Sequence, residues 1–202
     1  MADRQTLGVY ARRASDYAAR FNSEAPDRYL SRFISNLRKA SRVLDFGCGT
    51  GRAAAFMRDA GLEVDAWDAS AKMAAIGKAT FDLDIRIATF GELAAKEEYD
   101  GIYANFSLLH APKSEMPDHL YRIAVALRPS GLLHIGLKTG KGEARDRLGR
   151  FYAYYEDDEI TELLNNAGLT VETRDFGAEA GLEGTVEPWI IVQAKKTGSI
   201  QS

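Results

Sequence analysis

The segment VLDFGCGTGR, residues 43–52, constrains the fold of this chain more than any other stretch. An apolar run that leads directly into Gly47, Gly49 and Gly51 predicts a buried strand followed by a tight turn. Glycine adopts positive φ without steric cost, so such a turn lets the backbone approach a ligand closely. A second carboxylate, Asp68, follows Asp45 by 23 residues and ends another apolar run.

From residue 42 onward, strand-like and helix-like patterns alternate along the chain. We expect strands at residues 42–46, 62–68, 84–88, 99–104, 132–137, 169–175 and 188–194. We expect helices at residues 6–21, from Pro26, at 52–60, from Ser70, from Pro117 and at 157–167. This alternation predicts an α/β fold, in which a doubly wound, mainly parallel sheet carries helices on both faces.

The length of 202 residues and the absence of linkers or repeats predict one domain over residues 1–202. Residues 41–196 form its expected core, and residues 1–40 an N-terminal helical region. The sequence lacks a run of about 20 apolar residues and an apolar signal region, and its one cysteine, Cys48, cannot form an intramolecular disulfide. We therefore expect a cytoplasmic protein without membrane association.

The glycine turn and Asp68 together point to a nucleoside ligand. Parallel sheets bind ligands beyond the carboxyl ends of their strands, where a carboxylate can accept hydrogen bonds from both ribose hydroxyls. The spacing here is G-x-G-x-G, whereas dinucleotide folds use G-x-G-x-x-G. Asp45 beside the turn would also repel phosphates but could help to hold an ammonium group. These features favour S-adenosylmethionine over a nicotinamide dinucleotide.

Four blocks in register, VLDFGCGTGR, VDAWDAS, YDGIYANFSLLH and LRPSGLLHIGLK, resemble class I S-adenosylmethionine-dependent methyltransferases over about residues 40–175. The stretch 107–155 further resembles a bacterial subgroup of small methyltransferases. The resemblance implies a Rossmann-like sheet of seven strands in the order 3-2-1-4-5-7-6, with the seventh strand antiparallel. It also implies that the helices before the first strand, residues 1–40, form a lid over the ligand.

The same resemblance assigns the donor-binding residues. It places Asp68 on the ribose, and it places around the methionine portion Asp45, Gly47, Gly49 and Gly51, with Cys48 as a small filler of the turn. Around the adenine it places Ala69, Met73, Thr89 and Phe90. Thr89 is a departure, because family members often carry an aspartate there. Asn105 ends the fourth strand and is expected near the transferred methyl group.

The acceptor side rests on weaker signals. His110 follows the fourth strand and is the candidate general base; the alternative is a loop histidine bonded to backbone. His119 is interpreted as a helix-surface residue and His134 as a strand residue, both with structural roles, and the three histidines make no convincing metal site.

Basic and aromatic residues supply further acceptor candidates. Lys138 and Arg145 could grip an anionic group, or they could belong to a solvated loop. Tyr152 could wall the acceptor pocket, and Tyr10 and Tyr17 could belong to the lid, although core packing explains the same rings.

We therefore expect a methyltransferase that uses S-adenosylmethionine and moves its methyl group in line to an oxygen or nitrogen atom of a small molecule. The net charge of −3 disfavours nucleic acid as a partner, and no obligate protein partner is evident. Two alternatives stay open. A basic excess in residues 1–42 keeps an RNA acceptor in view, and a protein that only binds S-adenosylmethionine would carry the same glycines and Asp68.

Overall fold

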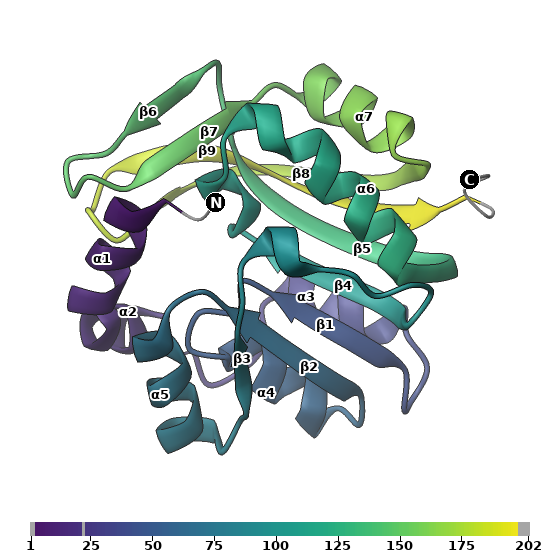
Figure 1. Cartoon of the computed structure of the whole chain (residues 1–202), viewed down its shortest axis with the longest axis horizontal. Helices are drawn as coiled ribbons and strands as arrows, with labels where there is room; N and C mark the ends of the chain where they lie inside the picture. The colour runs from purple at the N-terminus through teal and green to yellow at the C-terminus, as the bar shows by residue number, and fades with distance from the viewer. Residues whose placement is uncertain (1–2, 22, 198–202) are drawn as a thin grey trace.

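The computed structural model describes residues 3–21 and 23–197 and arranges them as one large sheet with helices on both faces (Figure 1). The strands are β1 (Arg42–Phe46), β2 (Glu63–Asp68), β3 (Ile85–Ile87), β4 (Tyr99–Asn105), β5 (Leu127–Thr139), β6 (Glu143–Arg145), β7 (Phe151–Tyr155), β8 (Leu169–Ala180) and β9 (Val186–Lys196). The helices are α1 (Arg4–Arg12), α2 (Ala14–Arg20), α3 (Arg28–Ser35), α4 (Arg52–Asp59), α5 (Ala71–Phe81), α6 (Met116–Ala126) and α7 (Asp157–Asn166). Short 3-10 turns are η1 (Phe90–Glu92), η2 (Leu108–His110) and η3 (Lys113–Glu115).

The strand order confirms the expected topology. Strands β3, β2, β1, β4 and β5 lie side by side and are parallel. Strand β9 pairs antiparallel with β5, and β8 pairs antiparallel with β9. Counted as the sixth and seventh strands, β8 and β9 complete the order 3-2-1-4-5-7-6 with the seventh antiparallel. The fold is therefore the doubly wound α/β fold that the sequence predicts.

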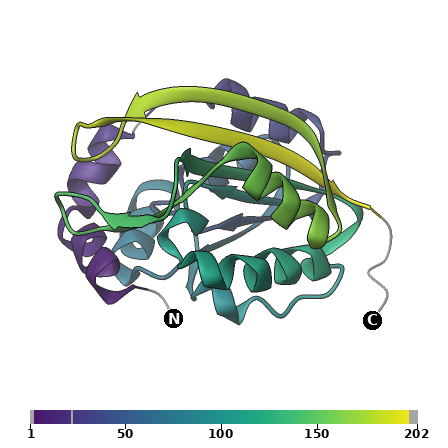
Figure 2. The same ribbon diagram turned by 90° about the horizontal axis from the view of Figure 1, so that it is seen from above.

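Alternation along the strands divides the core between the two faces. Val43 packs with Leu30 and Phe33 of α3, whereas its neighbour Leu44 belongs to the cluster that includes Leu120 of α6. Successive strand residues point to opposite sides of a sheet, so a fully apolar strand such as β1 can bury both faces. Figure 2 shows α3 on the opposite side of the sheet from α6 and α7.

Most helix ends follow from local chemistry. The Ser70 hydroxyl accepts the Met73 N–H and starts α5, and Pro117 lies in the first turn of α6. Glu156 caps α7 in a capping box, and Gly61 after α4 and Gly168 after α7 have positive φ. These features agree with the sequence expectations.

Three expectations are wrong in detail. The helix over 6–21 is two helices, because the backbone of Arg13 leaves the helical region at φ −107° and ψ 17°. The next helix begins after Asp27 and not at Pro26, because the Asp27 carboxylate caps the N–H groups of Tyr29 and Leu30. The segment 138–150, expected as a loop, contains β6 and the turn into β7.

The β6–β7 hairpin is an addition to the seven-stranded sheet. β7 pairs in parallel with the end of β5, and β6 pairs antiparallel with β7. The hairpin also holds α1, because the Phe151 N–H donates to Thr6 Oγ1 at 2.8 Å and Arg145 forms an ion pair with Asp3 at 2.8 Å. Figure 1 shows α1 beside this hairpin.

None of the helices within residues 3–21 and 23–197 combines the length and apolar character that a span requires.

Gly77 marks the closest approach of α5 to the glycine turn. A Cβ there would lie 2.9 Å from the Thr50 carbonyl oxygen and 2.4 Å from Ile85 Cδ1. We predict that Gly77→Ala lowers the free energy of unfolding by about 1–3 kcal/mol, because overpacking outweighs the helix propensity of alanine. Urea unfolding followed by circular dichroism measures the change.

Gly8→Ala in α1 is the matched control, because its Cβ would meet only the flexible tip of Arg12 at 3.3 Å. This variant is expected to be neutral or stabilised by up to about 1 kcal/mol. Equal effects of the two substitutions would show that α5 does not pack tightly on the turn.

Candidate active site

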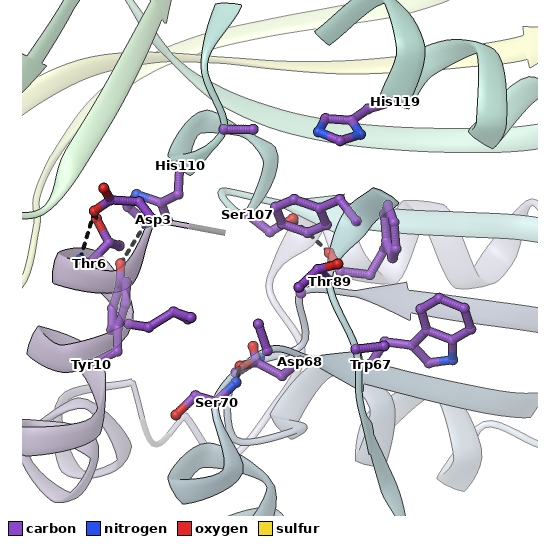
Figure 3. Close-up of a pocket in the computed structure, with 18 of the residues that line it drawn as sticks. Asp3, Thr6, Tyr10, Trp67, Asp68, Ser70, Thr89, Ser107, His110 and His119 are labelled. Carbon is purple, nitrogen blue, oxygen red and sulfur yellow. Dashed lines mark hydrogen bonds between the residues drawn. The ribbon is translucent and has the colours of Figure 1, made fainter. Parts of the chain in front are cut away.

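A cavity of about 400 Å³ lies beyond the carboxyl ends of β1, β2 and β4 and is bordered by α1 and α2 (Figure 3). Strands β1 and β4 are neighbours, and their connections leave in opposite directions, so the cavity sits at the point where the strand order reverses. Open parallel sheets bind their ligands at this position. The fold therefore places the cavity where the glycine turn predicts a ligand.

The glycine turn forms the floor of the cavity. The N–H groups of Gly47 and Cys48 both donate to the Trp67 carbonyl at 2.9 Å, which ties the turn to β2. Gly47 has φ +80°, and a Cβ there would lie 2.4 Å from Ser107 Cβ. Gly49 has φ +57°, and its Cβ would reach within 3.4 Å of the Tyr17 ring. Both glycines line the cavity, so bare backbone is exposed to a ligand there.

Asp68 lines the cavity at the end of β2. Its Oδ2 accepts the Gly49 N–H and its Oδ1 accepts the Ser70 N–H, each at 2.8 Å. An ionised carboxylate has about four acceptor positions, so both oxygens retain capacity for a diol. Burial raises the pKa of the Asp68 carboxyl to about 6, although the two N–H donors act in the opposite direction.

Three residues expected at the ligand lie outside the cavity instead. Asp45 is buried at the end of β1 with no hydrogen-bond partner on Oδ2, and burial raises its pKa to about 7. Gly51 faces away, because its Cβ would meet Leu83 Cδ1 at 2.8 Å. Cys48 is half-buried, and burial raises the pKa of its thiol, which agrees with a filler of the turn. The turn bends around these residues, so that of its glycines only Gly47 and Gly49 line the cavity.

The four residues expected around the adenine all line the cavity: Ala69, Met73, Thr89 and Phe90. The hydroxyl and the N–H of Thr89 both point to Glu92 Oε2, at 2.8 and 2.6 Å, in the cap of η1. The Thr89 hydroxyl proton is therefore engaged, and its oxygen is left as an acceptor only. Thr89 thus offers a neutral hydroxyl acceptor at the position where the resemblance implies an aspartate.

His110 lines the cavity at the end of η2, as expected. Its Nδ1 lies 2.6 Å from the Phe151 carbonyl, which can only accept, so we assign the ring proton to Nδ1. Its Nε2 then accepts the Tyr10 hydroxyl at 2.8 Å, and the Tyr10 oxygen accepts from Arg150 at 3.1 Å. Asp146 in turn pairs with Arg150 at 2.8 Å. These residues form a hydrogen-bonded chain from the hairpin to the cavity.

Burial, helped by the charges of Arg150 and Lys138, lowers the pKa of the His110 imidazole to about 4, although the hydrogen bond to the Phe151 carbonyl acts in the opposite direction. The ring is therefore neutral at pH 7, with its one lone pair directed at Tyr10. Its role as a general base remains a prediction, and this environment makes it a weak base. The hydrogen bond to backbone that the alternative interpretation expects is present, although the ring also faces the cavity.

Asn105 lines the cavity and is oriented by His134. The His134 Nε2 lies 3.0 Å from Asn105 Oδ1, and burial lowers the pKa of His134 to about 3, so the neutral ring donates to the amide oxygen. His134 also stacks on Tyr103 at 4.2 Å between ring centroids, which holds the imidazole in place. His134 thus bonds only the amide oxygen of Asn105 and makes no hydrogen bond with its N–H groups. His134 has the structural role expected for it.

The structure does not bring the expected acceptor cations to the cavity. The Lys138 ammonium pairs with Glu187 and lies 3.5 Å from the centre of the Tyr152 ring. Arg145 is engaged by Asp3, and Tyr152 is buried beneath His110 without lining the cavity. Among the described residues that line the cavity there is neither lysine nor arginine. Ion pairs with Glu187 and Asp3, which are remote in the sequence, hold the two side chains away from the cavity lining.

Sequence reasoning missed Thr6 and His119 as residues of the cavity, which Ser107 also lines. The Ser107 hydroxyl donates to the Phe46 carbonyl at 2.6 Å and helps to close the floor. His119, interpreted from the sequence as a helix-surface residue, is only 5% exposed. The burial of His119 could have been predicted from the sequence, because the apolar residues Met116 and Ile123 lie three positions before it and four positions after it on the same helix face. Both of these residues are buried.

Comparison with known proteins identifies the family. A family model described as a methyltransferase domain matches residues 17–174, more than half of the chain, so the protein belongs to this methyltransferase family. A protein of Staphylococcus carnosus (strain TM300) described as an uncharacterized methyltransferase is 29% identical over 173 residues, which are 81% of this chain and 83% of that protein.

A second relative and a solved structure agree. The malonyl-[acyl-carrier protein] O-methyltransferase of Enterobacter lignolyticus (strain SCF1) is 29% identical over 137 residues, or 65% of this chain and 53% of that protein. The crystal structure of Burkholderia thailandensis 1,6-didemethyltoxoflavin-N1-methyltransferase, with its substrate and S-adenosylhomocysteine bound, matches with a TM-score of 0.76. It is 23% identical and covers 96% of this chain and 88% of that chain.

The protein is accordingly an S-adenosylmethionine-dependent methyltransferase, as the sequence predicts. The cavity fits this donor by its own features. Side chains at Gly47 and Gly49 would intrude on the floor, and Asp68 keeps acceptor capacity toward the cavity. When bound, the donor supplies a methyl group on a positively charged sulfur, which leaves as a neutral thioether.

The ionisation of Asp68 makes donor affinity depend on pH. The ionised form accepts hydrogen bonds, and its pKa is about 6, so we predict that S-adenosylhomocysteine binds more tightly as the pH rises from about 5 to about 7. Asp68→Asn, which keeps an acceptor for the backbone, is expected to weaken binding about tenfold above this range and to flatten the dependence. Isothermal calorimetry across the range measures both effects.

Asp65→Asn is the control on the same strand, because Asp65 pairs with Arg42 and does not line the cavity. It should leave the affinity and its pH dependence unchanged. An Asp68→Asn protein with wild-type affinity would exclude Asp68 from donor binding.

Proposed function

We propose that the protein transfers the methyl group to a nitrogen or oxygen atom of a small acceptor that carries no net negative charge. The observation that carries this proposal is the absence of lysine and arginine from the described lining of the cavity. None of the described lining residues is a lysine or arginine that could pair with an anionic acceptor, so burying such an acceptor there would be unfavourable. A neutral or cationic acceptor suits such walls.

The same feature argues against RNA. Proteins bind nucleic acids largely by neutralising phosphates with lysine and arginine. In the N-terminal region, Arg13 pairs with Asp16 and Arg32 with Asp175, so part of its basic excess is already engaged. Small-molecule methylation is therefore the function that the site supports best.

Two similar proteins act on acceptors of different charge. One is named for methylation of N1 of a toxoflavin precursor, and the other for O-methylation of a malonyl group on a carrier protein. A malonyl group is an anion at neutral pH, whereas a heterocycle can be uncharged. The cavity of this chain favours an acceptor of the heterocyclic kind.

The donor-binding roles follow the family pattern. Gly47 and Gly49 would hold the methionine portion, Asp68 the ribose, and Ala69, Met73 and Phe90 the base. Asn105 and the Tyr10–His110 pair would then face the acceptor, because Asn105 ends β4, His110 ends the η2 turn that follows it, and Tyr10 of α1 is hydrogen-bonded to His110. The lid proposed for residues 1–40 corresponds to α1 and α2, whose Thr6, Leu7, Tyr10 and Tyr17 line the cavity.

Alignment and exclusion of water would supply most of the catalysis. Holding two reacting atoms in line can contribute about 7–11 kcal/mol to lowering the barrier. The neutral His110 directs its lone pair at Tyr10, so it is poorly placed to remove a proton before attack. The acceptor atom would accordingly have an available lone pair at neutral pH, and His110 would act by orienting the Tyr10 hydroxyl.

An acceptor panel tests the proposed charge preference. The wild-type protein with S-adenosylmethionine is offered neutral nitrogen heterocycles, amines, phenols, carboxylates, phosphate esters and a short RNA, and release of S-adenosylhomocysteine is measured. We expect turnover with uncharged or cationic members, and kcat/KM at least about tenfold lower for each anionic counterpart, because the cavity offers no partner for the charge. Turnover confined to carboxylates, phosphates or RNA would refute the proposal.

A second prediction concerns His110 at saturating donor. Because its pKa is about 4, kcat should show no acidic limb near pH 6.5, where an ordinary histidine base titrates. Tyr10→Phe should lower kcat about tenfold and change S-adenosylhomocysteine affinity less than about twofold, since it removes one hydrogen-bonding hydroxyl from the acceptor end.

Tyr121→Phe is the control for the loss of a tyrosine hydroxyl, because Tyr121 is 52% exposed on α6 and does not line the cavity. It should leave kcat unchanged. A kcat that falls with an apparent pKa near 6.5, in the wild type and not in His110→Asn, would make His110 the general base after all.

A further inference from the structure

Phe106 combines a large side chain with a backbone conformation that favours glycine. Its φ is +53°, in the left-handed region, where a bulky residue is strained. Of the residues that the structure describes, four others that are not glycine have positive φ: Ala40, Asp82, Glu97 and Ser130. All four are exposed and none lines the cavity, whereas Phe106 is half-buried and lines it. A strained residue at a binding cavity points to a functional role.

Neighbouring backbone holds Phe106 in this conformation. Its N–H donates to the Gly136 carbonyl at 3.0 Å, which ties the residue to β5. Gly136 also makes room for it, because a Cβ there would lie 3.2 Å from the Phe106 nitrogen and 3.3 Å from ring atom Cδ2. The following residue is fixed as well, since the Ser107 hydroxyl donates to the Phe46 carbonyl at 2.6 Å. The backbone of Phe106 is therefore constrained from both sides.

An aromatic contact supports the Phe106 ring on the side of β9. The ring of Trp189 is nearly perpendicular to it, at 79° and with 6.3 Å between the centroids. Trp189 also stands edge-on to Tyr29 of α3 at 5.6 Å, and it lies against the bare backbone of Gly177, where a Cβ would be 2.2 Å from the indole. Trp189 does not line the cavity. Phe106 thus borders the cavity with a well-packed ring behind it.

Phe106 belongs to the end of the cavity assigned to the acceptor. It directly follows Asn105 at the end of β4, and His110 ends the η2 turn four residues later. Tyr10 and His110 bring two more rings to this end, with 5.3 Å between their centroids, and Figure 3 shows them on the same side of the cavity. Aromatic rings attract one another beyond the area that they bury, in offset or edge-on arrangements. Such walls favour a flat, unsaturated ring over a puckered one.

We propose that Phe106 is a specificity residue that packs against a planar aromatic ring of the acceptor. This inference rests on the proposed function and narrows its acceptor class to molecules whose reacting atom belongs to, or is attached to, an aromatic ring. Phe106 would orient that ring and take no part in proton transfer. Its ring also packs against the main hydrophobic cluster, so the test has to separate aromatic character from bulk.

A pair of neutral compounds tests the proposal by binding alone. Protein saturated with S-adenosylhomocysteine is titrated with 2-naphthol and with decahydro-2-naphthol, which share the hydroxyl group and the two-ring skeleton but differ in planarity. The wild type should bind 2-naphthol about fivefold more tightly, as expected for an aromatic pair. Phe106→Leu, which keeps an apolar side chain, should lose about fivefold toward 2-naphthol and less than about twofold toward decahydro-2-naphthol and S-adenosylhomocysteine.

Two further variants control for the ring and for the substitution. Phe106→Tyr keeps the ring and should retain the preference. Phe176→Leu makes the same exchange at a site on β8 that is 58% exposed and does not line the cavity, and it should change nothing. A wild type without a preference for 2-naphthol, or a Phe106→Leu protein that keeps it, would overturn the proposal. So would equal weakening toward both compounds, which would mean that only bulk matters.

A measurement on the wild type keeps the proposal testable if Phe106→Leu does not fold. In protein labelled with ¹³C-phenylalanine and saturated with S-adenosylhomocysteine, the Phe106 ring resonances should move on addition of 2-naphthol and stay in place with decahydro-2-naphthol. Equal movement with both compounds, or none with 2-naphthol, would contradict ring packing. The acceptor panel measures charge preference by turnover, and this experiment compares two neutral compounds by binding. Failure of this inference and failure of the proposed function are therefore distinguishable.

Discussion

The two hydrogen bonds accepted by the Asp68 carboxylate are the interaction on which the rest of the site depends. One comes from Gly49 in the glycine turn and the other from Ser70 at the start of α5, so a single side chain joins β1, β2 and α5 at the cavity floor. Burial opposes the charge of this carboxylate and raises its pKa, while the two N–H donors stabilise it. The same group keeps acceptor capacity toward the cavity, where we propose that it binds the ribose of the methyl donor.

The opposite wall depends on contacts that span the length of the chain. The β6–β7 hairpin holds α1 through the bidentate pair of Arg145 with Asp3, and Arg150 orders the Tyr10 hydroxyl against His110. Arg145 and Arg150 are basic residues that form these contacts with α1 and therefore do not line the cavity. The wall is therefore polar and aromatic without being cationic, and this character sets the kind of acceptor that it suits.

The two histidines that line the cavity differ in how their polarity is compensated. His110 is buried with both ring nitrogens hydrogen-bonded, so its polarity is compensated within the protein. His119 is buried without a hydrogen bond to either ring nitrogen, and the carboxylate of Glu115 faces its Nε2 at 3.6 Å. Fully hydrogen-bonded buried groups such as His110 give the wall its rigidity.

The sequence by itself determined the sheet, the glycine floor and the place of Asp68, because these follow from local rules: apolar runs, turn-forming glycines and helix caps, each readable within about ten residues. It also placed His110 and Phe90 at the cavity, because both follow a strand end. Only the tertiary structure decided whether Lys138, Arg145 and His119 line the cavity. Their environments depend on partners such as Glu187, Asp3 and Phe90, which are remote in sequence, and ion pairing and burial are properties of the packed chain that no local pattern encodes.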